Sequence, residues 1–246
     1  MSIKLENVVL ASPEQMMFVI QGLRNPMNSY DRIDSKIEPE TIGDFGEEYG
    51  SVFELGNNDH SLMQRLAKAG TDHRKFMRMM PVYVRITAPL YWWKEFDTYK
   101  VGTVANSCST MHKIQEKEFT LEDFSTEHLL DSDIHCYPLG GGWRGLSPIE
   151  TLKSTIELLN NARQRYLAAL KTEEETGLPA KDIWWQMIKL LPSSYNQTRN
   201  VMLNYEVLAN IYKSRKNHKL DCWRELCKWI ETLPYSELIA GKMEDV

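Results

Sequence analysis

The sequence predicts an α+β fold, because its two halves repeat apolar residues with different periods. In the N-terminal half, residues 1–10 alternate weakly, and Met80–Thr87 (MPVYVRIT) is rich in β-branched and aromatic residues, which is typical of strands. From residue 147 onward, apolar residues recur every three or four positions, as they do on one face of an α-helix. Strands followed by helices along one chain favour the α+β class.

Caps and breakers place the remaining elements of the N-terminal half. Ser12 and Pro13 predict the start of a helix that continues through Ile20, with Ser12 as its N-cap. The other expected segments are, in order, a polar loop over 22–35, a helix over 59–70 ended by Gly70, a helix over Leu90–Phe96 and a loop over 99–112.

The C-terminal half is expected to be helical throughout. Ser147 and Glu150 have the spacing of a capping box, and they open a helix that reaches about Lys171. Further helices are predicted over 181–191, 198–215 and 220–233. No linker interrupts the chain, so we expect a single domain over 1–246, in which the acidic stretch 113–145 is an irregular insertion or loop.

Composition narrows the class of function. The 246 residues include 29 basic and 34 acidic side chains, for a net charge of −5, which argues against a protein that binds duplex nucleic acid. No apolar run approaches the ~20 residues that cross a bilayer, and the first residues lack the apolar core of a signal peptide. Four cysteines are too few for a disulfide framework. We expect a cytoplasmic protein that does not enter a membrane.

Several conspicuous residues have ordinary structural explanations. The triple glycine before Trp143 lacks the Lys-Ser/Thr of a phosphate-binding loop and favours a flexible hairpin or loop. The six histidines lack metal-binding spacing, so no metal site is predicted. The paired tryptophans are expected in cores or subunit interfaces, or alternatively stacked on a flat ring, and Cys222 and Cys227 as core or half-buried thiols. The basic residues over 213–219 predict a solvated surface, or alternatively an anion pocket.

Asn204, Asn210 and Arg215 form a less ordinary pattern on the helix expected over 198–215. In a helix, Asn204 and Arg215 would share a face to within about 20°, at roughly 16 Å along the axis, whereas Asn210 would face another neighbour. Amides on an otherwise apolar helix need partners when they are buried. Structural hydrogen bonds explain one such asparagine better than they explain the whole set.

With this spacing, residues 191–224 resemble the C-terminal core of the flavin-dependent thymidylate synthases. That family has a Leu-Pro, then an asparagine, a second asparagine six residues later and an arginine five residues after that; here these are Asn204, Asn210 and Arg215. Met80–Phe96 (MPVYVRITAPLYWWKEF) looks like the strand, Ala-Pro and helix that lead into the family signature.

The signature itself is degenerate in this chain. Its Arg-His-Arg falls on Thr98-Tyr99-Lys100, its two serines on Thr103 and Cys108, and its Arg-Tyr on Thr110-Met111. A slip of one residue restores asparagine at Asn106 and serine at Ser109, but no arginine. The arginine that precedes the family's Leu-Pro falls on Ile188. A dUMP phosphate would therefore lose most of its charge-assisted bonds, each of which contributes about 1.5–3 kcal/mol.

The resemblance implies roles for particular residues. Arg215 would be catalytic, contacting and polarising the uracil ring, and Glu95 and Cys108 would bind the substrate with it. The residues expected to bind the flavin are Tyr99, Lys100, Asn106, Asn204 and Asn210. The family uses FAD, takes its carbon from methylene-tetrahydrofolate and its electrons from NADPH, and assembles as homotetramers with sites between subunits.

Three hypotheses about function follow. The first is a divergent flavin-dependent thymidylate synthase-like methyltransferase that binds FAD and a dUMP-like pyrimidine nucleotide for reductive one-carbon transfer. The second is a catalytically silent paralogue that keeps the fold as an oligomeric nucleotide-binding, regulatory or assembly module. The third is a plain helical interaction protein unrelated to that family.

Overall fold

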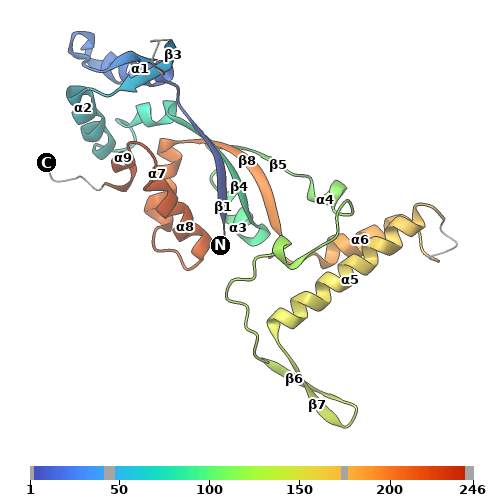
Figure 1. Ribbon diagram of the computed structural model, residues 1–246. Helices are drawn as coiled ribbons and strands as arrows, with labels where there is room; N and C mark the ends of the chain where they lie inside the picture. Colours follow the sequence, from blue (N-terminus) through green and yellow to red (C-terminus); the bar gives the residue numbers. More distant parts are fainter. Residues whose placement is uncertain (1–2, 42–47, 173–176, 242–246) are drawn as a thin grey trace. The chain divides into compact units, whose positions relative to one another are not determined.

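The computed structural model describes residues 3–41, 48–172 and 177–241 (Figure 1). It divides into two compact units, and the division falls inside four of its strands. The helix-pair unit comprises Met1–Lys4, Thr87–Phe96 and Ser107–Arg199, and the sheet unit comprises Leu5–Ile86, Asp97–Asn106 and Asn200–Val246. Within the described ranges, no helix is both long enough and apolar enough to cross a membrane.

A four-stranded sheet has the order β1-β4-β8-β5, and most of each of its strands belongs to the sheet unit. Its strands are β1 (Lys4–Leu10), β4 (Pro81–Pro89), β5 (Val104–Ser107) and β8 (Asn196–Asn204). Val82, Val84 and Ile86 of β4 are buried while Tyr83 and Arg85 between them are exposed, so this strand packs one of its faces into the core. A separate antiparallel pair joins β2 (Lys36–Thr41) to β3 (Glu48–Glu54).

The helices of the sheet unit are α1 (Pro13–Arg24), α2 (Asn57–Lys68), α7 (Tyr205–Arg215), α8 (Asp221–Ile230) and α9 (Glu237–Ala240), with short 3-10 turns η1 (Asn25–Met27), η2 (Tyr30–Arg32) and η3 (Lys75–Met79). Ser12 caps α1 as predicted, and Gln15 completes a capping box with it. The apolar faces of these helices supply core residues such as Ile20, Met63, Leu208 and Trp223, each fully buried.

The helix-pair unit has a core of its own. It contains α3 (Leu90–Phe96), α4 (Thr110–Lys113), the 3-10 turn η4 (Leu121–Asp123), α5 (Pro148–Ala169) and α6 (Ala180–Leu190). Leu152, Ile156 and Leu159 of α5 pack with Met187 of α6 and with Phe119. The tryptophans of α3 are buried, as expected, whereas Trp185 on α6 is 41% exposed.

A hairpin of β6 (His135–Leu139) and β7 (Gly142–Leu146) leads into α5 in this unit (Figure 1). Ser147 then caps α5 by accepting a hydrogen bond from the Glu150 amide. The segment 113–145, expected to be irregular, is therefore ordered in part. Cys222 and Cys227 are buried as predicted, and all four cysteines are free.

Three boundaries and the make-up of the C-terminal part differ from the sequence prediction. The helix expected over 198–215 is wrong in its first third, because residues up to Asn204 belong to β8 and α7 starts at Tyr205. The loop expected over 99–112 includes β5 and the start of α4, and the loop over 22–35 begins with the end of α1 and two 3-10 turns. The part of the chain from residue 147 onward, expected to be helical throughout, contains the strand β8, and the sheet to which β8 belongs does not fit a plain helical protein.

Candidate functional site

Arg215 lies at the last turn of α7 and is held by aromatic side chains. Its Nε donates a hydrogen bond to the Tyr99 hydroxyl at 3.0 Å. The guanidinium carbon lies 4.7 Å from the centre of the Trp223 ring and 5.8 Å from that of Tyr99. Trp223 is fully buried, while Arg215 and Tyr99 are half-buried. Stacking on aromatic faces orients a planar guanidinium without neutralising its charge.

His218, just beyond α7, contacts the same arginine. Its Nε2 lies 3.0 Å from Arg215 Nη1, and its Nδ1 accepts a hydrogen bond from the Leu220 amide at 3.2 Å. A neutral imidazole has only one acceptor nitrogen, so it accepts a hydrogen bond from one of these two donors and not from both; with Nδ1 accepting from Leu220, the approach of Arg215 Nη1 to Nε2 is a contact and not a hydrogen bond. The neighbouring lysines 213, 216 and 219 are exposed, so the basic run forms a solvated surface, with Arg215 as its half-buried member.

Asn204 has a structural role that the sequence prediction missed. It is the N-cap of α7, and its Oδ1 accepts a hydrogen bond from the Val207 amide at 3.1 Å. Its Nδ2 faces the loop over 97–106, where a Cβ on Gly102 would lie 2.9 Å away. Gly102 has φ +77°, so both its conformation and its closeness to Asn204 favour glycine.

Asn210 faces other partners than Arg215, as the helical geometry predicted. Its Oδ1 accepts a hydrogen bond from Arg74 Nη2 at 3.0 Å. One turn earlier, the buried Glu206 accepts from Arg78 and lies 3.5 Å from Arg74 Nε. The hydrogen bond from Arg78 lowers the pKa of Glu206 below its ordinary range, although burial opposes it. This face of α7 is therefore an ion-paired contact with η3 and the turn before it.

The loop that bears the degenerate signature presents few cations. Lys100 and Asn106 are exposed, and Lys100 is the sole cation among residues 97–106. Thr103, at the position of a family serine, has a buried Oγ1 with no hydrogen-bond partner in the described part of the chain. A buried hydroxyl without a partner is costly, and is therefore a candidate for a contact that a ligand supplies.

Two predicted substrate-binding residues belong to the helix-pair unit. Cys108 is exposed and lines a polar cavity of about 270 Å³ together with Thr87, Lys117 and Gln197. Glu95 lies on α3 and is half-buried. Cys108 and Glu95 are therefore in a different unit from Arg215 and the residues expected to bind the flavin.

Sequence reasoning missed the largest of these cavities, which is in the sheet unit. It measures about 860 Å³ and lies among the end of α1, the turns that follow, α2 and η3. Its charged lining residues are Arg24, Arg32, Arg65, Lys75, Asp31 and Asp72. Arg24 is paired with Asp59 at 2.6 Å, whereas the other three cations are exposed and form no ion pair with any described residue. These cations come from three separate elements, so no local spacing could have indicated them.

The described residues offer no group of three or more His, Cys, Asp and Glu side chains that could hold a metal ion. The polar features of the sheet unit that could bind a ligand are the cation-lined cavity and Arg215, which packs against aromatic rings.

Comparison with known proteins adds information at the level of structure only. No family model matches the chain. No curated protein matches it in sequence.

Solved structures, in contrast, match nearly the whole chain. Flavin-dependent thymidylate synthase ThyX from Helicobacter pylori, complexed with FAD and dUMP, has a TM-score of 0.57 at 14% identity and covers 99% of this chain and 100% of that one. The UMP/dUMP methylase PolB from Streptomyces cacaoi, bound with 5-Br dUMP, has a TM-score of 0.52 at 14% identity and covers 94% of this chain and 88% of that one. The chain has the fold of the flavin-dependent thymidylate synthases, which is the α+β architecture that its residues 80–96 and 191–224 predicted.

Proposed function

We propose that this protein binds FAD and a dUMP-like pyrimidine nucleotide, and that it performs a reductive one-carbon transfer as a divergent flavin-dependent thymidylate synthase-like protein. One observation carries the proposal. In the fold of a protein solved with FAD and dUMP, this chain keeps Arg215 at the end of α7 and holds it with Tyr99 and Trp223.

Phosphate groups on both ligands require cations that the degenerate signature lacks. The 860 Å³ cavity supplies Arg32, Arg65 and Lys75, and the signature loop supplies Lys100. Arginine suits this role because its planar fork of donors matches phosphate oxygens. We propose that these cations would bind the phosphates of a dinucleotide such as FAD, which when bound would supply hydride chemistry.

Each residue then has a stated task. Arg215 would donate hydrogen bonds to the ring carbonyls of the nucleotide, and Tyr99 would position it. Asn204 has already committed its Oδ1 to capping α7, so its contact with the flavin would be made through Nδ2. Asn106 and Asn210 would be further flavin contacts, and Glu95 and Cys108 would bind the substrate.

Completing the reaction would require methylene-tetrahydrofolate as the carbon donor and NADPH as the reductant. We propose that the active form is a homotetramer, as the family resemblance implies. Family sites lie between subunits, so one chain alone would not have to hold a complete site.

The first test is the absorbance spectrum of the purified protein before and after adding FAD, on material whose mass is measured by light scattering. The paired near-ultraviolet and blue bands of bound flavin are expected. The double variant Arg65→Gln/Lys75→Gln should bind FAD at least tenfold more weakly, about 1.4 kcal/mol. Lys68→Gln is the matched control, because Lys68 lies on α2 beside Arg65 but does not line the cavity.

A second test addresses the nucleotide. In calorimetric titrations with dUMP and with UMP, Arg215→Gln should weaken binding while Arg163→Gln, which removes a cation from the other unit, should not. Equal affinities in both variants would contradict a role for Arg215 in binding the nucleotide.

The silent paralogue is the alternative, and one observation favours it. The Arg215 guanidinium already contacts Tyr99, Trp223 and His218 within the chain, an arrangement that would serve a purely structural role. An assembled protein that stays colourless with FAD and does not bind either nucleotide would decide for this alternative.

A further inference from the structure

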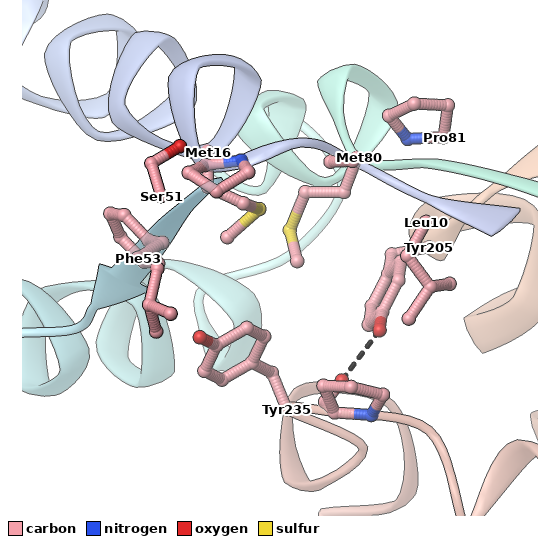
Figure 2. Close-up of a pocket in the computed structure, with 12 residues that line it drawn as sticks. Leu10, Met16, Ser51, Phe53, Met80, Pro81, Tyr205 and Tyr235 are labelled. Carbon is pink, nitrogen blue, oxygen red and sulfur yellow. Dashed lines mark hydrogen bonds between the residues drawn. The ribbon is translucent and has the colours of Figure 1, made fainter. Parts of the chain in front are cut away.

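A second cavity of the sheet unit has a chemistry unlike that of the cationic one. It measures about 280 Å³ and is partly open to solvent. Figure 2 shows it between α1, the strand that carries Ser51 and Phe53, and the segment that carries Tyr235. It is formed entirely within the sheet unit.

The walls of this cavity are aromatic rings, thioethers and prolines. The rings are those of Phe53, Tyr205 and Tyr235, and the thioethers are those of Met16 and Met80. Thioether sulfur and aromatic edges both pack favourably against a flat ring. None of the described residues that line it is Lys, Arg, Asp or Glu. A ligand with an uncharged aromatic ring would therefore complement the walls of this cavity.

The cavity has one polar group that lacks a partner. The Tyr205 hydroxyl donates to the Pro234 carbonyl at 2.5 Å, and Ser51 donates to Glu14 at 2.9 Å. Tyr235 lines the cavity with its hydroxyl directed toward the strand that carries Phe53 (Figure 2), and this hydroxyl forms no hydrogen bond with any described residue. Burial raises the pKa of Tyr235, so this hydroxyl stays protonated at neutral pH.

The backbone of Tyr235 is strained. Its φ is +58°, in the left-handed region that bulky side chains rarely adopt. The turn is fixed on both sides, because the Ser236 amide donates to the Leu233 carbonyl and the Leu238 amide donates to the Tyr235 carbonyl. A strained backbone conformation of this kind persists only where the surrounding structure enforces it, and residues with such conformations are frequent at sites that contact ligands. Here it accompanies an aromatic ring that forms one wall of the cavity.

We propose that this cavity is a binding site for a small neutral aromatic molecule of one or two rings that carries one hydrogen-bonding group. The rings of Phe53, Tyr205 and Tyr235 would pack against the ligand, and the Tyr235 hydroxyl would bind its polar group. The volume is below the range of about 300–1,000 Å³ that holds drug-sized ligands, so the ligand is of fragment size. This site is separate from the proposed flavin and nucleotide contacts.

Indole is a suitable probe, because it is neutral, has two fused rings and carries a single N–H donor. Saturation-transfer NMR on the full chain, without FAD or nucleotide, should show magnetisation passing to indole. Tyr235→Phe should weaken the affinity about two- to tenfold, the range expected for one hydrogen bond. Tyr83→Phe, on an exposed strand position outside the cavity, is the matched control and should bind as the parent does.

A variant that fills the cavity completes the test. Ala11 lines the space, so Ala11→Phe should abolish the transfer to indole while circular dichroism remains that of the folded parent. The absence of transfer to the parent chain overturns the proposal, and so does unchanged transfer in folded Ala11→Phe. If Ala11→Phe does not fold, equal affinities of Tyr235→Phe and Tyr83→Phe overturn it. None of these results depends on whether the protein binds FAD.

Discussion

At the scale of single residues, Arg24 and Asp59 form a buried ion pair in the sheet unit whose stability depends on its hydrogen bonds. Asp59 is fully buried, and it accepts two bonds from Arg24 and three from the amide and hydroxyl groups of Ser35 and Asp34. Burial raises the pKa of Asp59, but the bonds from Ser35 and Arg24 outweigh burial and hold the pKa below its ordinary value. The carboxylate is therefore ionised in the native protein.

Asp59→Asn should lower the free energy of unfolding by about 3–5 kcal/mol, because it leaves the Arg24 guanidinium buried without a counter-charge. The pKa of Asp59 is lower in the native than in the unfolded protein. The stabilisation is therefore fully present at pH values above the unfolded-state pKa of about 3.9, and it disappears as the pH falls through the native-state pKa. Urea denaturation at several pH values should show the variant approaching the parent below about pH 4. Asp31→Asn, an exposed neighbour, is the control; an equal loss in both would contradict the explanation.

Asn204 permits a separation of structural and ligand-binding roles. Asn204→Ala removes the cap of α7 and should cost about 1 kcal/mol of stability in denaturant titration. Serine caps as well as asparagine does, so Asn204→Ser should keep the stability but lose the Nδ2 donor. If Asn204 contacts the flavin, Asn204→Ser should bind FAD more weakly at unchanged stability. Full FAD affinity in the serine variant would assign Asn204 to capping alone.

At the scale of elements, long helices with clear caps were predictable and the strand before α7 was not. α5 is 22 residues long and starts at a serine cap, so its period is visible over many turns. In β8, Val201 and Leu203 are buried on alternate positions, but this alternation is short. Val201, Tyr205 and Leu208 also fit a helical spacing, and for this reason the predicted helix began too early and included the residues of the strand. Asn204, a favoured cap residue, was the signal that separated the two elements.

The β6–β7 hairpin gives a prediction at the same scale. Leu139 pairs with Gly142, which leaves Gly140 and Gly141 as a two-residue turn with φ values of +59° and +85°. Two positive φ values are those of a type I′ turn, which side chains other than Asn, Asp and Gly resist. Gly141→Val should therefore destabilise the hairpin by about 1–2 kcal/mol, enough to open an isolated pair of strands.

Amide hydrogen exchange over residues 135–146 is the measurement. Gly141→Val should lose protection in both strands, whereas Gly140→Asn, which restores the favoured Asn-Gly turn, should retain it. Protection of α5 should be the same in both variants, because its core contacts lie along α5 and α6 and not in the hairpin. Equal protection of the hairpin in the two variants would contradict the assigned turn.

At the scale of the whole molecule, the sequence indicated the fold better than the site. Spacing along α7 identified Arg215, but its aromatic partners lie on other elements, Trp223 on the next helix and Tyr99 116 residues earlier in the chain, so their contact is a property of the fold. The cationic cavity was missed for the same reason, since Arg32, Arg65 and Lys75 follow no common period. A single sequence shows periodicity within an element, whereas a site assembled from several elements becomes visible only in three dimensions.

The cationic cavity leads to a test that involves the protein as a whole. A ligand that binds only the native state, at 100 times its Kd, stabilises it by about 2.7 kcal/mol. For a chain of this size each kcal/mol raises the Tm by about 2–4 °C, so FAD should raise it by about 5–11 °C. Riboflavin has the same ring system and ribityl chain but neither the phosphates nor the adenosine of FAD, and at the same concentration it should give a smaller shift if Arg32, Arg65 and Lys75 hold the phosphates. Raising the salt concentration should reduce the FAD shift more than the riboflavin shift, because screening weakens contacts between exposed charges. Equal shifts for the two ligands would mean that the cavity cations do not bind the phosphates, and FAD recognition would then rest on the parts that riboflavin shares, the isoalloxazine ring and its ribityl chain.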